Sequence, residues 1–178
     1  TAARIVKSGG NSMNASIAAG ILACGDYHGG AIENSMVLIK NNFGRPAAQV
    51  VTEYRKQNKR LAGFGHKLYD MDPRAQKLLE LSDREGVSGG HVNFALELEK
   101  ELEKAAGKKF CINVDGAIAA ILCEMNVDPR LGKGLFALAR TAGIVAHVFE
   151  ESNEKPFRRL EDHKYEGERK NKFQDVRA

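Results

Sequence analysis

Residues 63–74 read Gly-Phe-Gly-His-Lys-Leu-Tyr-Asp-Met-Asp-Pro-Arg, and this stretch holds two groups that are typical of a substrate site. His66 follows a glycine-flanked turn, and Arg74 follows an Asp-Pro pair that can begin a helix. A proton-transfer group and an anion-binding group therefore lie close together, which favours a substrate that carries carboxylates. An ordinary loop followed by a capped helix has the same pattern, so the interpretation depends on the rest of the chain.

The chain has 178 residues, a length that allows one large core or two small lobes. The chain begins with Thr1 rather than Met, and we expect it to be a fragment or a processed product.

The formal net charge of the chain, +4, is modest, and its basic runs lack aromatic platforms, which favours a bound small anion over nucleic acid. A nucleic-acid binder that uses the basic segments 56–60 and 169–172 is a less favoured alternative.

The cysteines and the hydropathy pattern indicate a soluble, cytoplasmic protein. Cys24, Cys111 and Cys123 lack the spacing of a disulfide framework or a zinc site, so we expect a reducing environment and no structural metal. No apolar run approaches the roughly 18 residues of a membrane span, and the N-terminus lacks a signal-peptide pattern. We therefore expect no membrane partner.

Hydrophobic spacing indicates helices along most of the chain. Small and apolar residues in 3–23 predict a buried helical segment that is broken at two glycines. Further helical patterns follow at 33–39, 46–60, 73–85, 91–104, 117–125 and 129–149. The polar residues after Glu150 predict an extended arm of the kind that often reaches another subunit.

Four more residues are candidates for chemistry. His28 lies in a glycine-rich turn that lets backbone amides approach a ligand, although such a turn is also a common helix end. Asp115 follows an apolar segment at a helix start, which suits either an N-cap or a poorly solvated carboxylate base. Arg140 lies in a long apolar helix and, if buried, needs a carboxylate partner from the protein or a ligand. His147 in the same helix is more typical of a hydrogen-bonded core histidine.

The order and spacing of these residues resemble the citrate synthase superfamily, which also includes citryl-CoA lyases and the C-terminal module of ATP-citrate lyase. The resemblance covers nearly the whole chain. Its motifs are His28 in Tyr-His-Gly-Gly-Ala, His66 in Gly-Phe-Gly-His, Arg74 in Asp-Pro-Arg, Asp115 in Asn-Val-Asp-Gly, Arg140 in Ala-Arg-Thr-Ala-Gly and Arg158 in Pro-Phe-Arg-Arg. Each motif alone is weak, whereas six in this order are specific.

The resemblance implies an all-helical, two-domain fold that dimerises and has its active site in the cleft between the domains. Residues 1–30 and 131–178 would belong to the large domain, and residues 31–130 would form the small domain. The N-terminal helices of the family have no counterpart in this sequence. We therefore expect part of the large domain, including one further substrate-binding histidine, to be missing.

The resemblance also implies a chemistry, in which acetyl-CoA joins oxaloacetate or citryl-CoA is cleaved. Asp115 would remove a methyl proton, His28 would hydrogen-bond the thioester oxygen, and His66 would protonate the ketone oxygen. Coenzyme A enters as part of the substrate, so no permanently bound cofactor is expected. The substrate-binding groups would be Arg74, Arg140 and, from the neighbouring subunit, Arg158, with the backbone of Gly63, Phe64 and Gly65 against the CoA adenine.

The direction of the reaction is left open by this pattern. The sequence Asn-Val-Asp-Gly-Ala-Ile at 113–118 is more similar to the lyases, because citrate synthases commonly have a bulkier residue after the acid. A synthase and a lyase share one transition state, however, so the catalytic groups do not separate them. A 2-methylcitrate synthase and a non-catalytic dimerisation or CoA/citrate-binding module of the same fold are the alternatives.

Overall fold

The protein is built from helices. A computed structural model describes residues 1–66, 68 and 70–157, and the regular secondary structure in this part of the chain is helical throughout. The helices are α1 (Ala2–Ser8), α2 (Met13–Leu22), α3 (Ala31–Asn42), α4 (Ala47–Lys56), α5 (Pro73–Arg84), α6 (Gly90–Ala106), α7 (Val114–Glu124) and α8 (Leu131–Glu151). The predicted all-α fold is confirmed.

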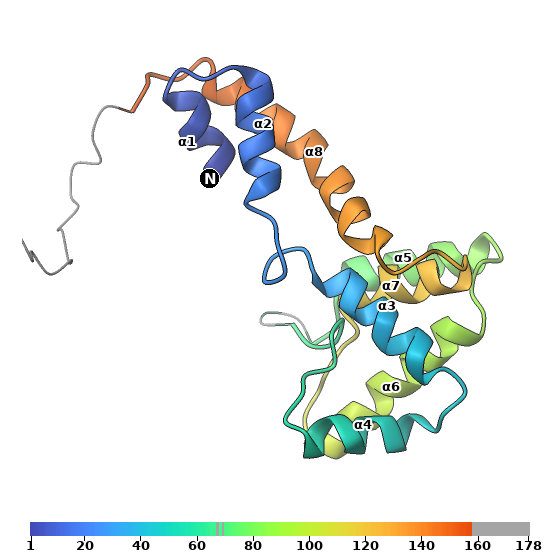
Figure 1. Ribbon diagram of the computed structural model, residues 1–178. Helices are drawn as coiled ribbons and strands as arrows, with labels where there is room; N and C mark the ends of the chain where they lie inside the picture. Colours follow the sequence, from blue (N-terminus) through green and yellow to red (C-terminus); the bar gives the residue numbers. More distant parts are fainter. Residues whose placement is uncertain (67, 69, 158–178) are drawn as a thin grey trace, which may run out of the picture.

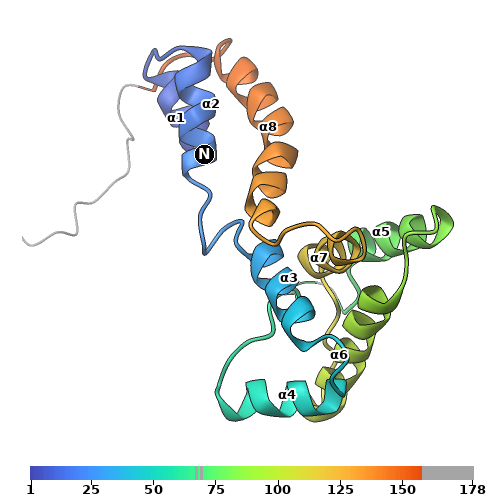
Figure 2. The same ribbon diagram turned by 45° about the vertical axis from the view of Figure 1, so that its right-hand side comes forward.

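The helices form two groups that α8 connects (Figure 1). Helices α3 to α7 pack on one another, and α8 begins beside α3 at this group. From there α8 runs away to α1 and α2, which pack against it and against each other (Figure 2). The division of the chain between a large and a small domain stays a prediction.

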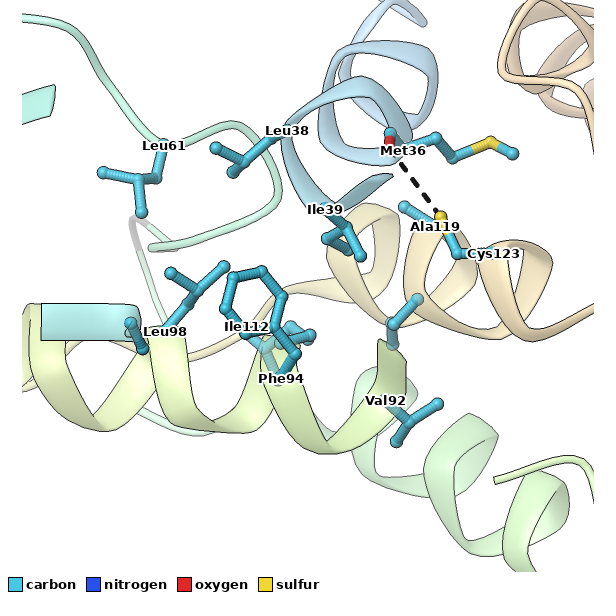
Figure 3. Close-up of a cluster of buried hydrophobic side chains, with 14 of the residues drawn as sticks. Met36, Leu38, Ile39, Leu61, Val92, Phe94, Leu98, Ile112, Ala119 and Cys123 are labelled. Carbon is cyan, nitrogen blue, oxygen red and sulfur yellow. Dashed lines mark hydrogen bonds between the residues drawn. The ribbon is translucent and has the colours of Figure 1, made fainter. Parts of the chain in front are cut away.

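The hydrophobic core lies in the α3–α7 group (Figure 3). Met36 and Ile39 on α3 are fully buried, as is Leu98 on α6, and each such side chain contributes about 1.5–3 kcal/mol through burial. Helix α7 supplies the alanines Ala117, Ala119 and Ala120, all inaccessible to solvent. Their small side chains let α3 approach α7 closely, which fixes the first turn of α7 in space.

Helix starts are determined partly by local sequence and partly by distant residues. The Asp-Pro pair before α5 behaves as predicted, with Asp72 as the N-cap and Pro73 in the first turn. Helix α6 starts after Gly89, which has no side chain to cap it. Its cap comes from Glu124 at the end of α7, whose carboxylate accepts the backbone N–H groups of His91 and Val92.

Helix α2, which was predicted to be buried, and the apolar helix α8 both expose apolar side chains. The side of α2 that carries Leu22 and the side of α8 that carries Leu138 face solvent, with these residues 83% and 70% exposed. Arg140 and His147 on α8 are exposed as well, so the prediction of His147 as a core histidine is wrong. His147 pairs with Glu150 one turn later, at 2.9 Å. The exposed apolar side chains recur along α8 from Leu131 to Phe149, a pattern that marks a packing site.

Within the described residues, none of the helices combines the length and the apolar character that crossing a bilayer requires.

Candidate active site

The first turn of α7 carries Asp115 and is capped by Asn113. The Oδ1 atom of Asn113 accepts the backbone N–H groups of Asp115 and Gly116, at 3.0 and 3.1 Å. The sequence left open whether Asp115 is an N-cap or a base, and the structure gives the cap to Asn113. The Asp115 carboxyl lies half-buried at the helix start and does not cap the helix.

The glycine loop at 63–65 is tied to the same helix start. The Nδ2 atom of Asn113 donates to the carbonyl of Gly65 at 3.0 Å, and the Asn113 backbone N–H donates to the carbonyl of Gly63 at 2.9 Å. Gly63 has a φ of +87°, and a Cβ there would lie 2.7 Å from the Cα of Gly116. Only glycine satisfies both the backbone angle and the available space.

Arg74 is held by a buried carboxylate. Asp72 Oδ1 accepts the backbone N–H and the Nε–H of Arg74, both at 3.0 Å, and Asp72 Oδ2 accepts Nη2–H at 2.8 Å. Oδ2 also accepts the backbone N–H of Val114, at 3.0 Å. The Asp72 side chain is fully inaccessible, whereas that of Arg74 is 51% exposed. Asp72 thus supports Arg74 from behind and joins it to α7.

His66 lies next to Arg74. The Nε2 atom of His66 is 3.4 Å from Nη2 of Arg74, and its Nδ1 atom accepts the backbone N–H of Leu68 at 3.1 Å. The ring is therefore oriented from both sides. The proximity of His66 and Arg74 that the 63–74 sequence suggested is present in the structure.

The carboxyl of Asp115 is surrounded by charged side chains. Burial raises its pKa, while the guanidinium groups of Arg74 and Arg140 and the cationic form of His28 act in the opposite direction. The carboxylate of Asp72 adds to the increase. Residues that are far apart in the chain thus act on the charge of one carboxyl group.

Phe136 positions two of these groups and was not identified from the sequence. The ring of His28 meets the Phe136 ring edge-on, with centroids 5.8 Å apart. The guanidinium of Arg140, one helical turn later, lies 4.8 Å from the Phe136 centroid. Gly29 is needed beside this ring because a Cβ there would come within 2.8 Å of it. The i, i+4 spacing of Phe136 and Arg140 was the available signal, but the contact with His28 was not visible in the sequence.

Some of the candidate residues line two cavities, whereas Asp115 and Arg74 line neither of them. One, of about 710 Å³, lies among α1, α2 and α8 and is lined in part by His28 and Arg140. The other, of about 930 Å³, is formed by the loop 61–66 together with α4 and α6. Its lining includes the predicted coenzyme residues Gly63, Phe64 and Gly65, His66, and the basic side chains of Arg55, Lys59, Arg60 and Lys108. Arg158 lies outside the described residues.

Comparison with known proteins identifies the family. The family model "Citrate synthase, C-terminal domain" matches residues 1–160. A citrate synthase from Synechocystis sp. is 35% identical over 136 residues, which cover 73% of this chain and 34% of that protein. The chain spans about a third of the length of the citrate synthases that it matches.

Solved structures agree with this result. The citryl-CoA lyase from Hydrogenobacter thermophilus superimposes with a TM-score of 0.89 at 46% identity, covering 93% of this chain and 68% of that one. The ATP citrate lyase from Methanothrix soehngenii, in complex with citrate and coenzyme A, gives a TM-score of 0.78 at 26% identity, covering 92% of this chain and 30% of that one. The predicted fold class is confirmed.

Asp72 should make stability depend on pH in the acid range. Its hydrogen bonds with Arg74 lower its pKa from 3.8 to about 2, despite the opposing effect of burial. The ionised Asp72 carboxylate therefore stabilises the folded state by about 2 kcal/mol. This contribution is complete above about pH 4 and is lost as the pH falls through about 2. Urea unfolding should show that the wild type has a larger free energy of unfolding than Asp72→Asn at about pH 6, and that this difference becomes smaller as the pH falls to about 2. A difference that does not change with pH would contradict this assignment.

Proposed function

The chain belongs to the citrate synthase family, and we propose that the whole protein forms or cleaves the carbon–carbon bond of citryl-CoA. The observation that carries the proposal is the half-buried Asp115 carboxyl, with Arg74, Arg140 and His28 around it. Enolate chemistry on a substrate with several carboxylates requires a base of raised pKa beside anion-binding cations. The electrostatic surroundings of Asp115 support this chemistry.

In the direction of bond formation, Asp115 removes a proton from the methyl group of acetyl-CoA. His28 donates a hydrogen bond to the thioester oxygen as that oxygen gains enolate charge. The enolate carbon attacks the ketone carbon of oxaloacetate, and His66 gives its proton to the ketone oxygen, which becomes the hydroxyl of citryl-CoA. All the chemistry is carried out by side chains and the substrate thioester, so the reaction needs no permanently bound cofactor.

In the direction of cleavage, His66 removes the hydroxyl proton of citryl-CoA and the carbon–carbon bond breaks. Oxaloacetate leaves, and the enolate of acetyl-CoA takes a proton from Asp115. The greater identity with a citryl-CoA lyase, 46% against 35% for a citrate synthase, favours this direction. Gly116 also supports it, because a Cβ at this position would lie 2.2 Å from the carbonyl oxygen of Gly63. The bulkier residue that citrate synthases commonly have there does not fit this backbone.

The carboxylates of the substrate would be bound by Arg74 and Arg140. A charge-assisted hydrogen bond contributes about 1.5–3 kcal/mol, so two arginines are sufficient to orient a tricarboxylate. Arg74 presents half of its surface on the side away from Asp72, and Arg140 lines the cavity beside His28. Arg158 of a neighbouring copy is proposed as the third such group.

The cavity beside the glycine loop is proposed as the coenzyme A site. Coenzyme A carries an adenine ring and several phosphates. The loop backbone at 63–65 offers a surface for the adenine, and Arg55, Lys59, Arg60 and Lys108 supply cations for the phosphates. On this proposal, the basic residues Arg55, Lys59 and Arg60, which precede the loop in the sequence, bind the phosphates of coenzyme A.

Replacing the proposed base should abolish turnover. General acid–base catalysis contributes about 10²–10⁴-fold, so we expect Asp115→Asn to lower kcat by about that factor. The measurement uses the whole protein with citryl-CoA, following oxaloacetate formation, and with acetyl-CoA and oxaloacetate, following thiol release. Asp83→Asn, an exposed aspartate on α5, is the matched control. A kcat of Asp115→Asn that stays close to the wild-type value would remove Asp115 as the base. A wild type that binds coenzyme A without any turnover would favour a non-catalytic module.

The coenzyme site can be tested through its charges. Removing one phosphate contact costs about 1.5–3 kcal/mol, so Lys59→Ala or Arg60→Ala should raise the KM for the CoA substrate about tenfold or more. Because neither side chain reaches the reacting atoms, kcat should change little. Lys77→Ala, on the exposed side of α5, provides the control. An unchanged KM for the CoA substrate in both variants would place the phosphates elsewhere.

We also propose that the protein forms at least a dimer. Exposed apolar side chains recur at helical spacing along α8, at Leu131, Leu135, Leu138, Val145 and Phe149, and a surface of this kind is one that a second copy can cover. Sedimentation equilibrium of the whole protein should give at least twice the monomer mass. Leu138→Glu should shift this equilibrium toward the monomer, whereas the exposed Lys77→Ala should not. A wild type that is monomeric at micromolar concentration would contradict the proposal.

A further inference from the structure

The chain contains two Asp-Pro-Arg sequences that form the same local ion pair. Asp128 and Arg130, just before α8, repeat the geometry of Asp72 and Arg74. The backbone N–H and Nε–H of Arg130 donate to Asp128 Oδ1 at 2.9 and 3.0 Å, and its Nη2–H donates to Oδ2 at 2.6 Å. The ion pair is therefore a consequence of the local sequence, and by itself it gives no evidence of a site.

The two pairs differ in what surrounds them. Asp128 and Arg130 have side chains that are 44% and 86% exposed. The Asp72 side chain is fully buried, and its Oδ2 also accepts the backbone N–H of Val114 at the start of α7. The Nη2 atom of Arg74 lies beside His66. Only the first pair therefore connects three parts of the proposed site.

We propose that Asp72 is a positioning residue, which fixes the Arg74 guanidinium beside His66 and holds Arg74 at a set distance from the first turn of α7. The inference rests on the proposed function, in which Arg74 binds a substrate carboxylate and Asp115 in that first turn is the base. A misplacement of about 1 Å in such a site can cost about 10²-fold in rate. Asp72 acts on the reaction through Arg74 and Val114 and does not touch the substrate itself.

A carboxylate is needed for this role, and not only a helix cap. Asparagine caps a helix about as well as aspartate, so Asp72→Asn keeps the start of α5. The asparagine side chain, however, has one acceptor oxygen where aspartate has two, and its amide hydrogens would face the N–H groups of the Arg74 guanidinium. The two-pronged hold on Arg74 is lost, while the shape of the side chain is kept. Asp128→Asn removes the same local pair at the exposed site and is the matched control.

Steady-state kinetics of the whole protein test the proposal. Asp72→Asn should raise the KM for oxaloacetate or citryl-CoA, and lower kcat/KM for it by about 10–10²-fold, with the KM for acetyl-CoA little changed. Asp128→Asn should leave all these constants close to wild type. Because part of the effect of Asp72 passes through Arg74, the double variant Asp72→Asn/Arg74→Lys should lose clearly less activity than the product of the two single losses. Additive losses, or an Asp72→Asn variant with wild-type kinetics, would overturn the positioning role.

A crystal structure of the Asp72→Asn variant separates this inference from the proposed function. The guanidinium of Arg74 should leave its place beside His66, and an unmoved guanidinium would overturn the inference whatever the activity. Absence of wild-type turnover in both directions would overturn the proposed function, while the displacement of Arg74 would still be tested. A variant that does not fold at neutral pH would also overturn the inference, because Asp72 would then serve folding itself.

Discussion

The amide side chain of Asn113 is the contact on which the geometry of the site depends. An asparagine amide both accepts and donates hydrogen bonds, so one side chain caps α7 and holds the carbonyl of Gly65. The helix start and the glycine loop are therefore fixed relative to each other. Gly63 and Gly116 are needed because the two backbones approach so closely that neither position has room for a Cβ. His66 follows this loop directly, and Asp115 lies in the capped turn.

Much of this architecture could be predicted from the sequence, and the successes are local. The Asp-Pro pair at 72–73 begins α5 as expected, because an N-cap and a proline in the first turn act within a few residues. The candidate residues could also be recognised, since each belongs to a short motif. The start of α6 is different, because its cap is Glu124, which is more than thirty positions away in the chain. The cap before Asp115 could not be assigned from the sequence either, since aspartate and asparagine are both good caps.

Burial was the property that the sequence predicted least well. The small and apolar residues in 3–23 suggested a buried helix, yet Leu22 on α2 faces solvent, as does Leu138 on the apolar helix α8. Composition indicates that a helix has a packing partner but does not indicate which surface provides it. The contact of Phe136 with His28 has a related origin, because it joins residues that only the packing of α8 beside the glycine-rich turn brings together. Arg140 shows the consequence, since it is exposed and lies over the ring of Phe136, so the condition of burial on which its need for a carboxylate partner rested is not met.

The electrostatic balance at Asp115 links these structural features to the proposed chemistry. Burial raises the pKa of this carboxyl, and Arg74 and Arg140 act against that increase. On the proposed function, both arginines bind substrate carboxylates, whose negative charge would offset the guanidinium charges. The pKa of Asp115 would then rise when the substrate binds, because the opposing effect is removed while burial remains. In the direction of bond formation, the Asp115 carboxylate would thus become a stronger base once oxaloacetate is bound. Proton removal from acetyl-CoA would then be slow until oxaloacetate is in place.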